Sequence, residues 1–133
     1  MEEEAWCFVI IIVDTHALIW YIEDSARLGK KAKAHLESAQ SRLMVSVIVL
    51  GEYLFYLKKR KMEPLYDQVF ATLQDDRRFQ IIETTSAHVR AIPEGLEMHD
   101  GLIAAVMLDY PGSIMLSQDH LLKAWGKDKI VWN

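Results

Sequence analysis

The chain has 133 residues, of which 51% are hydrophobic and 26% charged, with only six Gly and three Pro. This length predicts a single domain over residues 1–133, and the abundance of apolar residues excludes an intrinsically disordered chain. Fifteen Lys and Arg against 19 Asp and Glu give a net charge of -4. That balance excludes a protein that binds nucleic acid mainly through bulk positive charge.

Short runs rich in Ile and Val alternate along the chain with longer runs whose apolar residues recur at helical spacing. We predict strands over residues 8–13, 43–47, 79–82, 114–116 and 130–132, and helices over residues 15–22, 30–39, 50–61, 65–73, 86–92, 100–110 and 119–125. The first strand is an unbroken apolar run, which is typical of strands buried on both faces of a sheet. The alternation of strand and helix predicts an α/β fold, with a parallel sheet covered by helices on both faces.

The single cysteine, Cys7, lies in the apolar run that contains the first predicted strand. A single cysteine cannot form an internal disulfide, and we expect Cys7 to behave as a small buried hydrophobe. The acidic start, Glu2 to Glu4, is unlike the basic opening of a secretory signal. No apolar stretch reaches the ~20 residues needed to span a bilayer, so we predict a cytoplasmic protein with no membrane partner.

Four acidic residues lie where the predicted sheet would place a ligand, outside the carboxyl ends of its strands. Asp14 follows the first strand, Asp119 follows the 114–116 strand, Glu52 lies in the first turns of the helix after the second strand, and Asp100 begins a helix of small residues. Asp100 and Asp119 could each simply cap a helix. Asp14 and Glu52 interrupt apolar runs, where a solvated charge is difficult to place.

Acids that converge on one edge of a sheet repel one another unless a divalent cation neutralises them. Ligation by oxygen alone selects Mg²⁺ or Mn²⁺ rather than zinc. Mg²⁺ typically takes one or two protein carboxylates, keeps several waters and uses substrate phosphates for the rest. Such a site suits hydrolysis of phosphodiesters by a metal-activated water.

Four segments of the sequence resemble the motifs of PIN-domain ribonucleases, especially the VapC toxins of toxin–antitoxin pairs. They are VDTHALIW over residues 13–20, Val45-Ser46 leading to Glu52, HDGLIAA over residues 99–105, and LSQD over residues 116–119. The segments occur in the family's order and cover essentially the whole chain. Two departures are Gly101, which stands where Arg is common, and the acidic leader before the first strand.

The resemblance implies a three-layer α/β/α sandwich, Mg²⁺- or Mn²⁺-dependent cleavage of RNA, a homodimer and a small antitoxin that blocks the site. It makes Asp14, Glu52, Asp100 and Asp119 both the catalytic and the metal-binding residues. The Ser117 hydroxyl would support the site through a hydrogen bond, and Thr15 and Ser46 fall at polar positions beside the acids. The Gly101 difference bears on substrate contacts more than on the chemistry.

Histidines, cations and aromatic residues near these motifs have alternative interpretations. His16 and His99 could act in the chemistry, although a histidine bonded to backbone is the favoured interpretation of His16. The only dense basic cluster in the sequence consists of Lys58, Lys59, Arg60 and Lys61, and Arg77 and Arg78 add to it. This cluster is either a contact for the RNA backbone or the solvated end of a helix. The aromatic residues predicted to lie in the core or a dimer interface, rather than to stack on bases, are Trp20, Tyr21, Tyr53, Phe55 and Tyr56.

Other functions share the predicted fold. A signalling receiver normally has a pair of acids after its first strand, whereas Asp14 is followed by Thr15 and His16. A phosphatase with Asp14 as nucleophile commonly has a second Asp two positions on, where this chain has His16. A binding module without activity would not need all four acids. Nucleases that process RNA outside a toxin–antitoxin pair, or that cut DNA, remain alternatives within the same fold.

Overall fold

A five-stranded parallel sheet forms the centre of the structure, a computed structural model that describes residues 7–133. The strands lie in the order β3-β2-β1-β4-β5 and all neighbouring pairs are parallel. The strands are β1 (Val9–Val13), β2 (Ser41–Ser46), β3 (Phe79–Ile82), β4 (Ile114–Leu116) and β5 (Ile130–Val131). The helices are α2 (Thr15–Ile22), α3 (Lys30–Glu37), α4 (Val47–Lys59), α5 (Leu65–Asp75), α6 (Ser86–Arg90), α7 (Met98–Leu108) and α8 (His120–Gly126), with a 3-10 turn over Lys127–Lys129.

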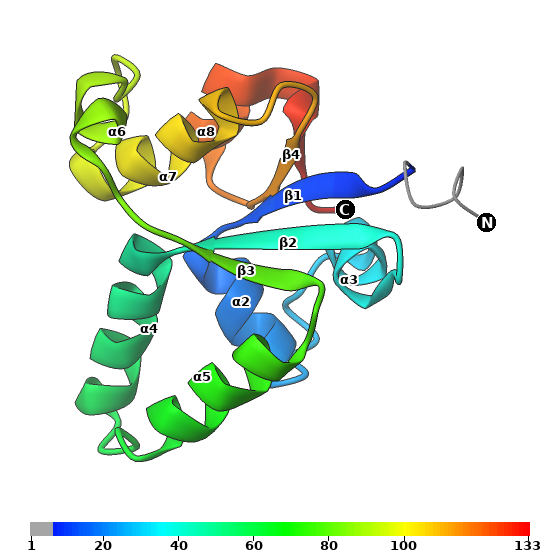
Figure 1. Cartoon of the computed structure of the whole chain (residues 1–133), viewed down its shortest axis with the longest axis vertical. Helices are drawn as coiled ribbons and strands as arrows, with labels where there is room; N and C mark the ends of the chain where they lie inside the picture. Colours follow the sequence, from blue (N-terminus) through cyan, green and yellow to red (C-terminus); the bar gives the residue numbers. More distant parts are fainter. Residues whose placement is uncertain (1–6) are drawn as a thin grey trace.

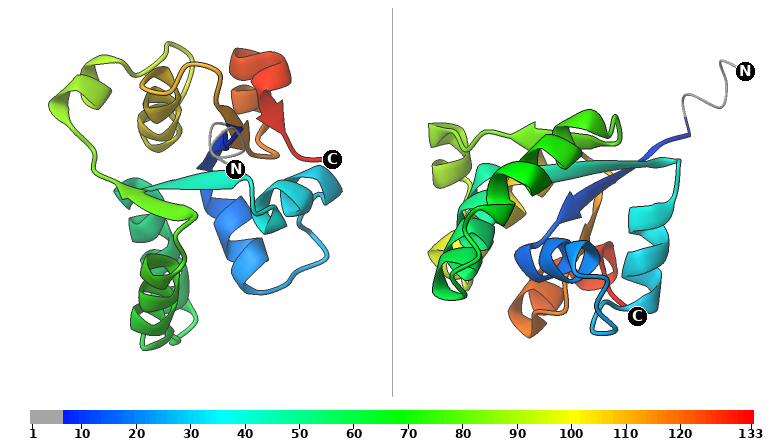
Figure 2. Two further views of the ribbon diagram at one scale, coloured as in Figure 1. Left: turned by 45° about the vertical axis from the view of Figure 1, so that its right-hand side comes forward. Right: turned by 90° about the horizontal axis from the view of Figure 1, so that it is seen from below.

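The helices cover the two faces of the sheet in two groups. In Figure 1, α2 to α5 lie below the strands and α6 to α8 lie above them. Seen from below in Figure 2, α2, α4 and α5 lie in front of the strands. This arrangement is the three-layer α/β/α sandwich that the sequence predicts, and the predicted elements are all present within a few residues of their expected bounds.

The path of the chain through the sheet creates a crevice beside β1. The chain steps outward from β1 through β2 to β3, then returns to the other side of β1 for β4 and β5. The carboxyl ends of β1 and β4 therefore flank the point where the strand order reverses. Ligands bind at such points in open α/β sheets.

The start of the first strand differs from the prediction. The strand begins at Val9, and its last three residues, Ile11 to Val13, are completely buried between β2 and β4. Cys7 is exposed and precedes the strand, so the expectation that it is a buried hydrophobe is wrong. The physical reason is that β4 pairs with β1 only from Ile11 onward. The residues before Ile11 therefore have β2 on one side and no strand on the other.

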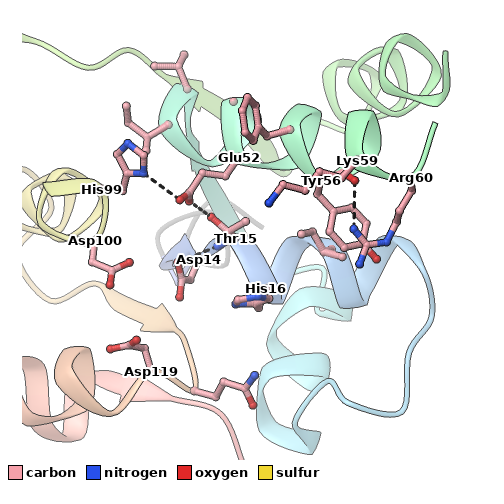
Figure 3. A pocket seen from close by; sticks show the side chains of 16 residues that line it. Asp14, Thr15, His16, Glu52, Tyr56, Lys59, Arg60, His99, Asp100 and Asp119 are labelled. Atoms are coloured by element: carbon pink, nitrogen blue, oxygen red, sulfur yellow. Dashed lines mark hydrogen bonds and ion pairs between the residues drawn. The ribbon is translucent and has the colours of Figure 1, made fainter. Parts of the chain in front are cut away.

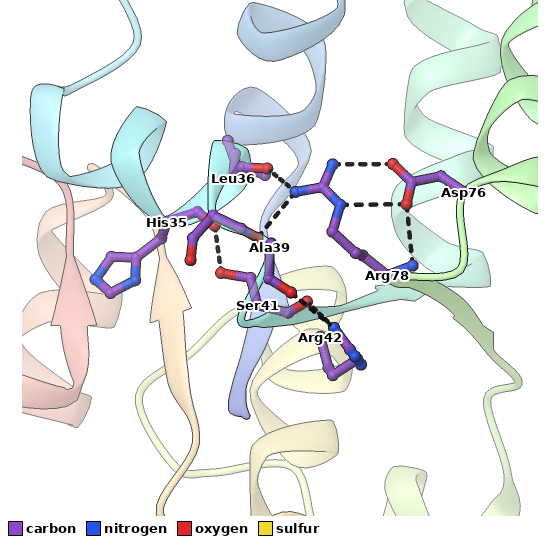
Figure 4. Close-up of polar contacts among 8 residues, drawn as sticks. His35, Leu36, Ala39, Ser41, Arg42, Asp76 and Arg78 are labelled. Atoms are coloured by element: carbon purple, nitrogen blue, oxygen red, sulfur yellow. Dashed lines mark hydrogen bonds and ion pairs between the residues drawn. The ribbon is translucent and has the colours of Figure 1, made fainter. Parts of the chain in front are cut away.

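Arg78 ties together the amino end of the sheet, the end opposite the four acids. Its guanidinium donates to the backbone oxygens of Leu36 at 2.6 Å and Ser38 at 3.1 Å, and to the Asp76 carboxylate at 2.9 Å (Figure 4). These bonds lower the pKa of Asp76 below its ordinary value. Arg78 therefore holds the end of α3 to the start of β3. The sequence had suggested that this arginine extends the basic cluster, whereas here it has a structural role.

Gly29 lets the C-terminal segment approach α3 closely. It immediately precedes the helix, and the Ala32 amide donates to the Trp132 carbonyl oxygen at 3.0 Å. A Cβ atom at Gly29 would overlap that same carbonyl oxygen and the Trp132 ring. Within residues 7–133, no helix has the length and apolar character required to cross a membrane.

Candidate active site

A pocket of about 820 Å³ lies at the carboxyl ends of the strands and brings the four predicted acids together. Asp14 comes from the end of β1, Glu52 from α4, Asp100 from α7 and Asp119 from the residues after β4 (Figure 3). The carboxylates of Asp14, Asp100 and Asp119 face one another across the pocket (Figure 3). The prediction that these four residues share one edge of the sheet is correct in its geometry.

Asp14 is the most enclosed of the four acids, with 7% of its surface exposed. One carboxylate oxygen accepts the Thr15 amide at 2.8 Å, and the other accepts the Ser117 hydroxyl at 2.7 Å. Asp14 also caps α2, so its backbone and side chain are both held. Burial raises the pKa of Asp14 above its ordinary value, and the bonds from Ser117 and Thr15 act in the opposite direction.

Ser117 connects the two acids that flank the crevice. Its hydroxyl oxygen donates to Asp14 and accepts the Asp119 amide at 3.1 Å. Asp119 caps α8 by accepting the amides of Leu121 at 2.9 Å and Leu122 at 3.0 Å. The capping role considered for Asp119 is therefore real, and it coexists with a position in the pocket wall.

Asp100 is surrounded by negative charge. The cap of α7 is Glu97, whose carboxylate accepts the Asp100 amide at 2.7 Å, so the expectation that Asp100 begins this helix is wrong. Asp100 lies in the first turn with its carboxylate in the pocket. Burial, followed by the charges of Asp14, Asp119, Glu97 and Glu52, raises the pKa of Asp100 to about 7. The part of this shift that comes from the neighbouring carboxylates would be relieved by a cation bound among them.

Glu52 is held at both of its carboxylate oxygens. The Thr15 hydroxyl donates to one of them, and His99 Nδ1 lies 3.2 Å from the other. Ser46 caps α4 by accepting the Ile48 amide at 3.1 Å, and it is buried outside the pocket lining. Ser46 thus contributes by starting the helix that carries Glu52, whereas Thr15 contacts Glu52 directly.

The donor set suits a hard divalent cation that brings its own waters. Within residues 7–133, no group of three or more His, Cys, Asp and Glu side chains is arranged so that it could hold a metal ion. Mg²⁺ does not require one, because it binds through one or two carboxylates and keeps several waters. The pocket supplies carboxylate oxygens that repel one another and leaves open volume beside them, so its residues fit such an ion.

The outer wall of the pocket, formed by α4, is aromatic and cationic. Lys59 and Arg60 line it, together with Phe55 and Tyr56, whereas Lys58 and Lys61 lie outside the lining. Tyr53 is buried in the core, one of the two positions predicted for the aromatic group. Phe55 is 64% exposed, so it does not lie in the core, and the alternative of a dimer interface stays a prediction. His16 also lines the pocket, and its ring stacks on Trp20 with centroids 5.6 Å apart, in place of the expected backbone bond.

Two contributors to the site escaped sequence reasoning. Glu97 caps α7 and fixes the position of Asp100 by accepting its amide. The sequence feature that could have predicted this cap is an acidic residue three positions before a second one, at the start of an apolar run. Gly101 is buried, and a Cβ atom there would lie 2.5 Å from Ile92 Cγ2. Close packing against α6 and its following loop therefore accounts for a small residue at this position.

Asp100→Asn is expected to stabilise the protein increasingly as the pH rises from about 4 to about 7. The raised pKa means that the folded state binds a proton more tightly than the unfolded state, whose carboxyl titrates near 3.9. The unfolding free energy therefore falls as pH rises through this window, and the Asn variant lacks that loss. Thermal unfolding of both proteins between pH 3 and pH 8 measures the effect. A melting-temperature difference that does not change with pH would contradict it.

Comparisons with known proteins identify the family of the chain and find solved structures with the same fold. A family model described as the PIN domain matches residues 11–127. The structure resembles a toxin-antitoxin complex from Klebsiella pneumoniae, with 20% identity over 92% of this chain and 95% of that chain and a TM-score of 0.65. It also resembles VapBC2 from Rickettsia felis bound to a DNA fragment from their promoter, with 16% identity over 94% and 100% of the two chains and a TM-score of 0.64. No curated protein sequence matches the chain.

Proposed function

The chain belongs to the PIN-domain family, and we propose that it is a Mg²⁺- or Mn²⁺-dependent endoribonuclease that acts as the toxin of a toxin–antitoxin pair. The observation that carries this proposal is the convergence of Asp14, Glu52, Asp100 and Asp119 on one pocket at the switch point of the sheet. Acids at this place, where burial and then the repulsion of neighbouring carboxylates raise the pKa of Asp100 to about 7, favour a site completed by a cation and a phosphate.

In this proposal one or two of the four carboxylates bind the cation, the others add negative charge around it, and neighbouring residues hold the carboxylates in place. When bound, the cation supplies charge neutralisation for the phosphodiester and a water of lowered pKa. Ser117 and the Thr15 amide orient Asp14, and the Thr15 hydroxyl and His99 orient Glu52. Each acid that is held by a second residue loses little conformational freedom when it binds an ion, so the site is organised before the ion arrives.

The negative charge of the four carboxylates explains why the proposed activity needs a cation. A phosphodiester is anionic, and the inner pocket presents four carboxylates to it without a balancing cation among them. A bound divalent ion reverses the local sign, so that the same residues attract the phosphate they would otherwise repel. The chain's net charge of -4 is compatible with RNA as substrate for this reason.

The toxin assignment rests on the structural neighbours, which are described as a toxin-antitoxin complex and as VapBC2. By analogy, we propose a small antitoxin protein as the partner that blocks the pocket, a homodimer as the functional unit and the cytoplasm as its location. Size-exclusion chromatography with light scattering tests the dimer.

Cleavage of defined RNAs with and without a divalent cation tests the proposed activity. We expect purified protein to cut RNA with Mn²⁺ or Mg²⁺ and to stop cutting in excess EDTA. Restoring Mn²⁺ should restore cleavage, which distinguishes removal of the ion from denaturation. Cleavage that continues at full rate in EDTA would contradict the metal-dependent mechanism, and labelling of Asp14 by a small phosphodonor would favour the phosphatase or receiver alternative instead.

A further inference from the structure

Phe55 presents an exposed aromatic ring to the pocket. It lies on α4 one turn after Glu52, lines the pocket and is 64% exposed. The Lys59 ammonium, one further turn along, lies 5.9 Å from the centroid of its ring. What distinguishes Phe55 from a single exposed apolar side chain is its place in the wall of the pocket, where its ring can stack on a planar ligand.

Gly51 leaves space at the same face of α4. A glycine inside a helix is less favourable than alanine, so it usually has a reason in packing or ligand approach. Packing supplies none here, because a Cβ atom at Gly51 would meet no atom within 4 Å. Gly51 is exposed and lines the pocket one turn before Phe55. The space it leaves is therefore available to a ligand that approaches the helix backbone.

Two cations stand at the outer end of this face. Lys59 and Arg60 line the pocket, and the Arg60 guanidinium lies 3.6 Å from the centroid of the Tyr56 ring. The Tyr56 hydroxyl donates to Glu23 at 2.6 Å, which holds the ring that supports Arg60. Glu52 and Lys59 are seven residues apart, or about 10 Å along the helix, roughly the length of three stacked nucleotides.

We propose that the face of α4 formed by Gly51, Phe55 and Lys59 is a subsite for an unpaired nucleotide adjacent to the phosphate that is cut. The base stacks on Phe55, the sugar-phosphate backbone uses the space at Gly51, and Lys59 contacts a phosphate further along the same strand. A base can stack on a protein ring only when it is free of its own helix, so the subsite selects single-stranded RNA over duplex. This inference rests on the proposed ribonuclease function and assigns a nucleotide subsite to three named residues of this chain.

Binding measured separately from cleavage tests the subsite. The protein carries Asp14→Asn so that RNA stays intact, and the probe is a short single-stranded RNA containing 2-aminopurine, whose fluorescence falls when the base stacks. Phe55→Ala should weaken binding about 10-fold, within the range for loss of one base stack, and should abolish the fluorescence change. Phe55→Trp should keep both, whereas Phe55→Leu, which is apolar but cannot stack, should behave as Phe55→Ala. Binding to a duplex of the same length should be unchanged in all three variants.

Lys58 and Lys59 provide a matched pair of cations on one helix. Both side chains are exposed, but only Lys59 lines the pocket. Lys59→Ala should reduce the slope of log affinity against log salt concentration by about 0.7, the contribution of one phosphate contact on a single strand. Lys58→Ala should leave the slope unchanged. Equal effects of the two substitutions would overturn the assignment of a phosphate to Lys59.

The outcomes separate failure of the subsite from failure of the ribonuclease proposal. If the protein cuts RNA with Mn²⁺ but Phe55→Ala binds as tightly as the parent, the subsite is wrong and Phe55 becomes a residue for docking a protein. If Phe55→Leu binds as well as Phe55→Trp, the contact is merely apolar and the stacking proposal is wrong. If no RNA is bound or cut, the ribonuclease proposal fails and the subsite fails with it.

Discussion

Asp14→Asn is expected to lower RNA cleavage by more than about 100-fold while the fold is retained. Asp14 is the acid at the centre of the proposed site, and replacing it removes a negative ligand from the cation. Losses of 10–100-fold are typical when only a supporting neighbour of a metal ligand is removed, so the ligand itself should exceed that range. The fold should survive because burial already opposes the charge of Asp14, and Asn keeps an oxygen that can accept one of its two hydrogen bonds.

Ser117→Ala is the graded control for this substitution. It removes the hydroxyl that donates to Asp14 and accepts from the Asp119 amide, but it leaves all four carboxylates. A loss of about 10–100-fold is expected, which is smaller than that of Asp14→Asn. Initial rates at saturating Mn²⁺, with circular dichroism of each variant, provide the comparison. A folded Asp14→Asn protein that cuts within a few-fold of the parent would contradict the proposed role of Asp14.

Gly29→Ala is expected to lower the free energy of unfolding by about 3 kcal/mol or more, an effect at the upper end of overpacking substitutions. The new methyl group would overlap the Trp132 carbonyl oxygen, which accepts the Ala32 amide, and the buried Trp132 ring. Backbone lies on both sides of the overlap, so no side-chain rotation relieves it. The backbone angles of Gly29, φ -62° and ψ 150°, are ordinary for alanine. The penalty therefore comes from the overlap alone.

Gly51→Ala is the matched control, because the same methyl group is added where nothing lies within 4 Å. Alanine inside a helix is more favourable than glycine, so stability should rise by about 0.5–1 kcal/mol. Urea denaturation of the three proteins gives both values. Similar stabilities for the two alanine variants would show that the contact between Gly29 and the C-terminal segment is not as close as described.

The sequence predicted the fold well because its strongest signals are local and agree with one another. Five short β-branched or apolar runs separated by helical periods leave few arrangements other than a parallel sheet. The clustering of Asp14, Glu52, Asp100 and Asp119 was predictable because the carboxyl ends of parallel strands share one edge. Nothing in that argument needed the strand order, which sequence pattern leaves open.

Features that depend on contacts between distant segments were less predictable. The exposure of Phe55 follows from the way α2, α4 and the ends of the strands leave a pocket, whereas Tyr53 and Leu57, two residues to either side of it on α4, are buried. The cap of α7 at Glu97 competes with an equally plausible cap at Asp100, and only the local backbone decides between them. The exposure of Cys7 depends on how far β4 extends along β1, which is a matter of strand length in another part of the chain.

The hydrogen bond from Ser117 to Asp14 joins residues 103 positions apart in the chain. A ribosome adds about 5–20 residues per second, so Asp14 exists for roughly 5–20 s before Ser117 and Asp119 are made. During that interval β1 has no β4 beside it, and the pocket lacks one wall. If the proposed function is correct, a nascent chain without residues 114–119 is expected not to cleave RNA, because the pocket is incomplete until β4 and Asp119 lie beside β1.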